Sequence, residues 1–437
     1  MNTAFPAEAQ LSPASPWRWW VCILLMLATV VNYMDRMALN QLAKPIKEAF
    51  DLSNQDYSQL ESVFSLAFAI GAITTGYIVD RVSVWWVYPI VVVGWSLAGI
   101  LTGMASAFWM LMGCRFLLGL FEAGNWPCGI RTTKAILRPE ERSFGNSLFQ
   151  SGTALGAVIT PLFVFAILQQ AEADGTPDSW RVPFRVIGML GLVWVALWFL
   201  TVSRKMLVAA VPAPAPPPAS EIDAELDEVL PPPPPPRFTA VFRDRRYWAL
   251  LAMAIAVNIT WHGYRTWLPL YLQDQRGYSP RDMSNFTTVY YLFADVGSWT
   301  VGLVTLLLCR RGMGVHAARL LAFSCCAILT VATLAVPFLP DGYPLQAGLL
   351  VVAFGALGLF PTYFALTQEV SMEHQGKVTG TLGASAHISL AAIYPVEGWL
   401  CDATGSYEWV LGGIGIFPLL ALCVMLWLWP PEKRPKI

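Results

Sequence analysis

Apolar runs recur along the whole chain, and at about 20 residues each they are long enough to cross the hydrocarbon core of a bilayer as helices. This feature constrains the fold more than any other. The composition agrees with it, because 56% of the 437 residues are hydrophobic, 13% are charged and the mean hydropathy is +0.52. A soluble domain carries roughly 25% charged residues. The sequence therefore predicts an all-α polytopic membrane protein.

We expect 12 transmembrane helices in two six-helix halves. The first half covers 17–203, with spans near 17–41, 57–79, 84–105, 107–136, 143–170 and 182–203. The second half covers 246–430, with spans near 246–272, 283–309, 316–338, 345–370, 377–401 and 406–430. The tails at 1–16 and 431–437 are too short and polar to add a span.

Residues 204–245 differ from both halves. The segment contains APAPPPA, the acidic stretch SEIDAELDEVL and a run of six prolines, so we expect a solvated linker, part of it in polyproline II conformation. Lys and Arg residues gather in this linker, in the tail and in the loops on the same side of the membrane. By the positive-inside rule, both termini and the linker are predicted to face the cytoplasm.

Six spans, a long middle loop and six more spans are the plan of secondary transporters whose two halves rock about a central site. A receptor, a channel or a membrane-embedded enzyme is the alternative. Such enzymes usually cluster His, Asp or Glu at metal-ligand spacing, whereas the four histidines here are scattered and the eight cysteines show no CxxC pair. We therefore expect a transporter that is not an enzyme and has no metal site or disulfide. The net charge of −1 gives no sign of a nucleic-acid partner.

Charged residues inside the predicted spans are the candidate functional residues, since a charge at membrane depth is costly and usually faces a cavity. Asp35 and Arg36 follow one another near the end of the first span. Arg115 and Glu122 in the fourth span are two helical turns apart, which puts them on one face about 10 Å apart along the axis. We interpret these four residues as two acid–arginine couples.

Two roles are open for such couples. They can simply hold helices together, or they can link a substrate to a proton. In the second case an anionic substrate takes the arginine, and the released acid then accepts a proton.

Several motifs give the chain a family resemblance. NYMDR in the first span and R-x6-E-x3-WP in the fourth resemble the anion:cation symporter family of the major facilitator superfamily, which includes bacterial hexuronate and galactonate transporters. FADVGS at 293–298, RRGMGVHAAR at 310–319, GKVTGTLG at 376–383 and GWLCDATGSY at 398–407 are similar to its sugar-acid branch. The resemblance implies the superfamily fold and transport of a small organic anion.

The same resemblance implies roles for individual residues. Asp35 and Glu122 would be the proton-coupling acids, and Arg36 and Arg115 would bind the substrate carboxylate. Two further polar residues would contact the sugar hydroxyls, namely Tyr33 and, on a looser match, Gln150.

The sequence departs from the family pattern in two places. The loop after the second span keeps Gly76, Asp80 and Arg81 of the superfamily's gating motif, but Trp85 and Trp86 stand where basic residues are usual. In the seventh span, Arg265 in WHGYRTW resembles the substrate-binding arginine of the vesicular glutamate transporters. The alternative is that Arg265 pairs with an acid of its own half; the candidates are Glu369, Asp295 and Glu397, which are also the secondary titratable residues.

Other polar or aromatic residues within spans are weaker candidates. We expect packing roles for His262 and His387, hydroxyl contacts to the substrate from Thr362 and Ser385, and pocket-wall positions for Trp126 and Trp267.

The sequence thus predicts a proton-coupled symporter that takes up an organic monoanion, a hexuronate or an aldonate, by alternating access. Protons are the coupling ion, no other cofactor is expected, and the protein is expected to be a monomer in the cytoplasmic (inner) membrane. The alternatives are a transporter of another carboxylate, such as an aromatic acid or a dicarboxylate, and a non-transporting sensor with the same fold.

Overall fold

The computed structural model describes residues 16–79, 81–137, 139–204, 207, 238–367, 370 and 375–429, and these residues are almost entirely helical. Predicted parts of the chain that lie outside the described residues are both tails and nearly all of the linker. The N-terminal half contains α1 (Pro16–Gln41), α2 (Ala43–Phe50), α3 (Asn54–Val79), α4 (Val84–Thr102), α5 (Phe108–Glu122), α6 (Asn125–Ile136), α7 (Pro139–Ala173) and α8 (Arg181–Thr201).

The C-terminal half begins with a short helix, η1 (Phe238–Arg243), and continues with α11 (Arg245–Leu270), η2 (Tyr271–Gln275), α12 (Pro280–Arg310), α13 (Val315–Val331), η3 (Ala332–Phe338), α14 (Tyr343–Thr367), α15 (Gln375–Thr404), α16 (Glu408–Ile414) and α17 (Phe417–Leu428).

The described helices are suited to a membrane. Nine segments are long and apolar enough to cross a bilayer. Large apolar side chains are widely exposed on the outer surface, for example Trp109, Leu200, Trp299 and Trp427, each of which is at least 75% exposed. A water-soluble surface would not tolerate so much exposed apolar area. The chain is a multi-pass membrane protein, as its apolar runs predict.

Three of the predicted spans are interrupted in the structure. The span at 107–136 consists of α5 and α6, the one at 316–338 consists of α13 and η3, and the one at 406–430 consists of α16 and α17. The break between α5 and α6 directly follows Glu122. Gly124 lies so close to α4 that a Cβ there would come within 2.8 Å of Val91, and the side chain of Asn125 bonds Tyr88 and Thr29 in turn. The break places a polar backbone region next to a buried acid.

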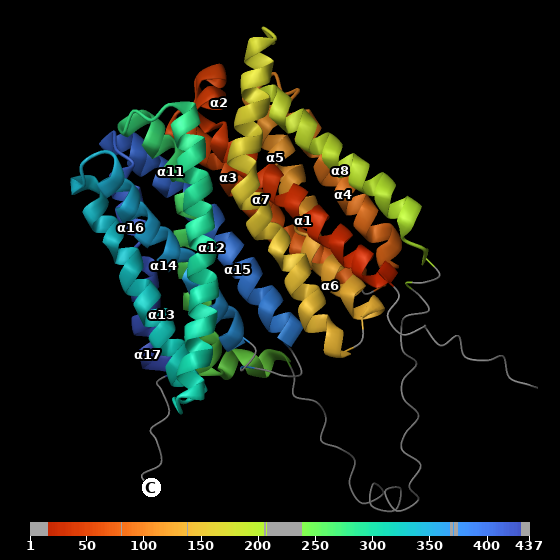
Figure 1. The fold of residues 1–437 in the computed structure, drawn as a ribbon, viewed down its shortest axis with the longest axis vertical. Coiled ribbons are helices and arrows are strands. Elements are labelled where there is room, and N and C mark those ends of the chain that lie inside the picture. Colours follow the sequence, from red (N-terminus) through yellow and green to blue (C-terminus); the bar gives the residue numbers. More distant parts are fainter. Residues whose placement is uncertain are drawn as a thin grey trace, which may run out of the picture.

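Helices pack mostly within their own half, and the two halves lie side by side (Figure 1). Two long helix pairs cross the interface between the halves: α3 packs along α15, and α7 packs along α12. Small residues allow the first of these contacts, because a Cβ at Gly398 would come within 2.6 Å of the Asn54 carbonyl oxygen. The Ser62 hydroxyl also donates a hydrogen bond to the Ala391 carbonyl, at 2.5 Å, further along the same pair.

At one end of the molecule the halves are joined by a polar network, which we call the end latch (Lys44, Lys47, Asn54, Asp274, Asp402 and Tyr407). The Asp402 carboxylate accepts bonds from the backbone N–H groups of Asn54 and Gln55, at 3.0 and 2.8 Å, and from the Asn54 amide, at 2.8 Å. It thereby caps the N-terminus of α3 from the other half.

The rest of the end latch lies around Tyr407. Its hydroxyl is 2.9 Å from the Asn54 side-chain oxygen and 3.0 Å from Asp274. Lys44 pairs with Asp274 at 3.0 Å, and Lys47 donates to Asn54 at 2.5 Å. The end latch therefore holds α2 and the start of α3 against η2 and the α15–α16 turn.

Candidate functional site

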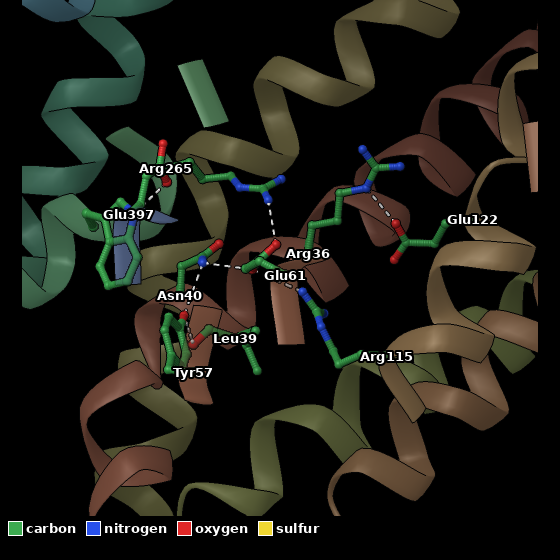
Figure 2. Close-up of polar contacts among 10 residues, drawn as sticks. Arg36, Leu39, Asn40, Tyr57, Glu61, Arg115, Glu122, Arg265 and Glu397 are labelled. Carbon is green, nitrogen blue, oxygen red and sulfur yellow. Dashed lines mark hydrogen bonds and ion pairs between the residues drawn. The ribbon is translucent and has the colours of Figure 1, made fainter. Parts of the chain in front are cut away.

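Glu61 on α3 lies at the centre of the interface between the halves. One of its carboxylate oxygens accepts a bond from Arg115 Nη2 at 3.1 Å, and the other accepts one from Arg265 Nη2 at 3.0 Å. Asn40 on α1 also donates to Glu61, at 3.0 Å. Figure 2 shows Glu61 between Arg265 on one side and Arg115 on the other. A single buried carboxylate thus joins an arginine of α5 to an arginine of α11.

A second buried ion pair lies beside it. Arg36 Nε donates to Glu122 Oε2 at 2.5 Å, and the Glu122 side chain is fully buried (Figure 2). Phe64 lies against both Arg36 and Arg115, with its ring centroid 5.2 and 4.8 Å from the two guanidinium carbons. Contacts of a guanidinium with an aromatic face stabilise the cation without adding a negative charge. We call Arg36, Glu61, Arg115, Glu122 and Arg265 the central cluster.

Asp35 points away from the central cluster. Both of its carboxylate oxygens are buried and neither accepts a hydrogen bond from a described residue. The side chain faces α4 at Gly99, where a Cβ would come within 2.9 Å of Asp35 Oδ1. Burying an unpaired carboxylate as an anion is very costly, so the neutral acid suits this environment.

These contacts correct the predicted couples. Arg36 pairs with Glu122 and not with Asp35, and Arg115 pairs with Glu61 and not with Glu122. The reason is geometric, because side chains at consecutive positions of one helix point in different directions and adjacent helices supply the nearest partners.

The predicted structural partners of Arg265 are also wrong where they are described. Glu397 accepts a bond from Trp267 at 2.8 Å. Asp295, on α12, is partly exposed and forms no ion pair within the described residues, while Glu369 lies outside them. The partner of Arg265 is Glu61, which belongs to the other half.

The sequence did contain a signal for Glu61. It is an acid within the predicted span at 57–79, and an ionisable residue at membrane depth is a candidate functional residue by default. Glu61 is not part of any of the family motifs, and it has no arginine near it in the sequence.

Comparisons with known proteins identify the family of the chain. The family model described as "Major Facilitator Superfamily" matches residues 25–380. The chain belongs to this superfamily. Among its relatives, the hexuronate transporter of Escherichia coli K12 is 23% identical over 424 residues, covering 93% of each chain. The D-galactonate transporter of Escherichia coli O6:H1 is 24% identical over 403 residues, which cover 89% of this chain and 90% of the relative.

A solved structure has the same fold. A bacterial homologue of the human lysosomal transporter Spinster, in an inward-facing and unoccupied conformation, superimposes with a TM-score of 0.75 at 17% identity, covering 95% of this chain and 98% of that one. The resemblance to the superfamily and to its sugar-acid transporters, which the motifs predicted, is confirmed.

The superfamily's gating motif lies away from the end latch. Arg81 lies in the turn after α3, is exposed, and stacks on Tyr77 of α3, with its guanidinium carbon 3.4 Å from the ring centroid. Gly76 has open space around it, and Asp80 is outside the described residues. Trp85, one of the two tryptophans that replace basic residues, donates to the Val202 carbonyl within the same half at 2.8 Å.

Two aromatic residues extend the central cluster across the interface. Phe68 on α3 lies under Arg36, with 4.5 Å between its ring centroid and the guanidinium carbon. His387 on α15 stacks on Phe68, with 4.1 Å between the ring centroids. The ring centroid of His262 on α11 is 5.9 Å from that of His387. These histidines have packing contacts, as predicted, but their neighbours are the aromatic residues beside the arginines.

The remaining predicted residues fall into two groups. Tyr33 and Trp267 lie beside the central cluster, with Tyr33 5.8 Å from Arg36 and Trp267 bonded to Glu397. The other four are elsewhere or make no polar side-chain contact that links them to the cluster: Gln150 is exposed on α7, Ser385 is half-buried on α15, Trp126 packs on Phe149, and Thr362 lines a separate cavity of about 390 Å³ between α12, α13 and α14.

Several polar atoms around the central cluster have no partner among the described residues. They are Arg115 Nε, Arg265 Nε and Nη1, Glu122 Oε1, the Tyr394 hydroxyl and the Thr266 hydroxyl. Buried polar groups are nearly always paired, so a set of unpaired ones marks a place for water or a polar ligand. Guanidinium donors would bind a carboxylate, and hydroxyls would bind hydroxyls.

Proposed function

We propose that this protein is a proton-coupled secondary transporter that takes up an organic monoanion of the sugar-acid class, a hexuronate or an aldonate. The observation that carries the proposal is the central cluster, in which three buried arginines meet at the interface between two halves of a transporter fold. The names of the relatives, a hexuronate and a galactonate transporter, support a sugar acid as the substrate. The chain then needs no cofactor besides the coupling proton, and it is not an enzyme.

We further propose that the chain crosses the membrane twelve times and that both termini face the cytoplasm. The membrane would be the inner membrane of the cell. Besides the nine apolar segments, the broken pair α5–α6 and the helices α11 and α15 would cross the membrane. Taken singly, α5 and α6 are short, with 15 and 12 residues, while α11 and α15 carry Arg265 and Glu397 in their interior, which lowers their hydropathy. The basic loops and the linker set the orientation.

With that orientation, the end latch lies on the outer side. The two halves are tied together there by Asp402, Asn54 and Tyr407, so this conformation would be closed to the outside. Transport would proceed by rocking of the halves about the central cluster, with the end latch broken in the opposite state. A monomer suffices for this movement, because each chain has both halves.

Within the central cluster, the substrate would engage Arg36 and Arg115, with Tyr33 near its hydroxyls. Glu122 is bound to Arg36, so an anion that takes Arg36 would free Glu122 to accept a proton. Asp35 has no ionic partner among the described residues and would carry a proton in this conformation. Substrate binding would therefore change the protonation of the two acids in different ways. It would act on Glu122 directly, by taking Arg36, and on Asp35 through the conformation of α1 and α4.

Transport by purified protein in proteoliposomes tests the proposal. An inward proton gradient alone should concentrate radiolabelled galacturonate or galactonate, and a protonophore should abolish the accumulation. A control with a sodium gradient at equal pH should give no accumulation. Uptake that follows sodium and ignores pH would contradict the proton assignment, and binding without any accumulation would indicate a sensor.

A further inference from the structure

Glu61 has no part in the substrate-binding and proton-coupling roles proposed for the other members of the central cluster. It is fully buried and offers one oxygen to Arg115 and the other to Arg265. A free carboxylate bound between the same arginines would present its two oxygens in the same manner. Because Arg115 belongs to the N-terminal half and Arg265 to the C-terminal half, Glu61 is also the ionic link between the halves at this depth (Figure 2).

The arginines have more bonding capacity than Glu61 uses. Each guanidinium has five N–H donors, yet only Nη2 of each one bonds Glu61, and Nε of both and Nη1 of Arg265 have no partner among the described residues. A second carboxylate ligand therefore finds donors at the same two side chains. A permanent structural link would be expected to use the planar fork of at least one arginine fully.

We propose that Glu61 is a built-in carboxylate ligand of the Arg115–Arg265 pair, and that the carboxylate of the transported anion replaces it there. The identity of that anion rests on the proposed function, whereas the replacement itself requires only a carboxylate. On binding, the anion would be held by Arg115 and Arg265, one arginine from each half. The carboxylate between them would then be free of the chain, so the ionic link would no longer include α3. Selection for a carboxylate over a neutral sugar follows, because only an anion compensates the two guanidiniums once Glu61 has left.

Chemical rescue provides the first test. Glu61→Ala leaves a space of carboxylate size between two buried arginines, so acetate should fill it in the purified full-length protein. Acetate at a concentration well above its dissociation constant should raise the Tm of this variant by about 2 °C or more, by mass action, and acetamide of the same shape should not. Glu397→Ala is the matched control, because it removes an equally buried acid that contacts Trp267 and no arginine.

The outcome of the rescue decides the inference. A larger shift with acetate than with acetamide in Glu61→Ala, and equal shifts in Glu397→Ala, would support it. Equal shifts with acetate and acetamide in both variants would overturn it, since the space would then have no preference for a carboxylate.

Glu61→Gln provides the second test and covers the case in which the alanine variant does not fold, because glutamine keeps the volume and two polar atoms. Without the competing charge, this variant should bind galacturonate at least about tenfold more tightly than the wild type in a calorimetric titration. If the wild type binds galacturonate, equal or weaker binding by the variant would overturn the replacement. If acetate rescues Glu61→Ala and galacturonate binds neither protein, the role of Glu61 stands and the sugar-acid substrate of the proposed function is wrong.

Discussion

The central cluster and the end latch both join the two halves, but they differ in burial and in the kind of interaction that they use. The central cluster is fully buried, with two arginines from different halves meeting on one carboxylate. The end latch is partly exposed and consists mainly of hydrogen bonds, with Asp402 exposed and Lys44 and Asp274 each at least 30% exposed. The first link is a set of buried ion pairs, and the second is a partly exposed network of hydrogen bonds with one ion pair.

This difference sets how each link responds to change. Removing one partner of a buried ion pair leaves an uncompensated charge and costs about 3–5 kcal/mol, whereas an exposed hydrogen bond or ion pair contributes about 1 kcal/mol or less. If the halves rock as proposed, the central cluster would require a replacement ligand before they separate there. The end latch would be cheaper to open, so its strength would set the balance between the two conformations.

The largest effect is expected at Arg115. Arg115→Ala leaves Glu61 with Arg265 alone and removes a proposed charged contact to the substrate carboxylate. Uptake should fall at least about 100-fold, because the loss of one partner of a buried, hydrogen-bonded charge pair costs several kcal/mol. Arg115→Lys should restore only part of the activity, because an ammonium lacks the planar fork. Initial uptake rates normalised to the amount of folded protein measure both. An alanine variant with more than half of the wild-type rate would remove the central cluster from the mechanism.

Neutralising the acids should separate coupling from binding. Asp35→Asn and Glu122→Gln keep all three arginines, so each variant should still exchange labelled for unlabelled galacturonate, which needs no net proton movement. Both should lose accumulation driven by a proton gradient. Counterflow and uphill uptake in the same proteoliposomes measure the two activities. A variant that still accumulates substrate would make its acid a structural counter-ion only.

A smaller effect is expected at the end latch. Asp402→Asn keeps a carbonyl oxygen but loses the charge that caps α3 across the interface, so the closed end should be destabilised by about 1 kcal/mol, or roughly fivefold in population. Distances between spin labels on α2 and α16 would report it. Asp56→Asn is the matched control, because Asp56 caps the same helix from within its own half through Ser53. Equal shifts in both variants would mean that α3 frays without any effect on the end latch.

The smallest effect is a pH dependence of the end latch. Burial lowers the pKa of the Lys47 ammonium below its usual 10.5, and the carboxylates of Asp274 and Asp402 offset that effect only in part. If Lys47 is solvated when the end latch is open, the closed form binds fewer protons. Raising the pH between the lowered pKa and 10.5 should then favour the closed form. The same spin-label distances should show this shift in wild type and not in Lys47→Gln. A shift toward the open form would contradict the sign.

Local sequence patterns predicted where the buried charges lie but not how they pair. Apolar runs predicted the membrane-spanning helices, and the acids and arginines of NYMDR and R-x6-E-x3-WP all proved to be buried in the interior. The pairing of these residues was predicted wrongly, since Arg36 bonds Glu122 and Arg115 bonds Glu61. Gln150 and Thr362 are predicted substrate contacts that lie away from the central cluster. Gln150 is exposed, and Thr362 lines a separate cavity.

The sequence by itself determined which segments enter the bilayer and which charges go in with them, because both follow from the transfer of side chains out of water and need only local composition. Only the tertiary structure decided which charges meet. Glu61 and Arg265 are 204 positions apart, and Asn54 and Asp402 are 348 positions apart, in different halves. No local pattern encodes such a contact, because the partner of a buried charge is the group that the packing of α15 against both α3 and α11 brings within 3 Å.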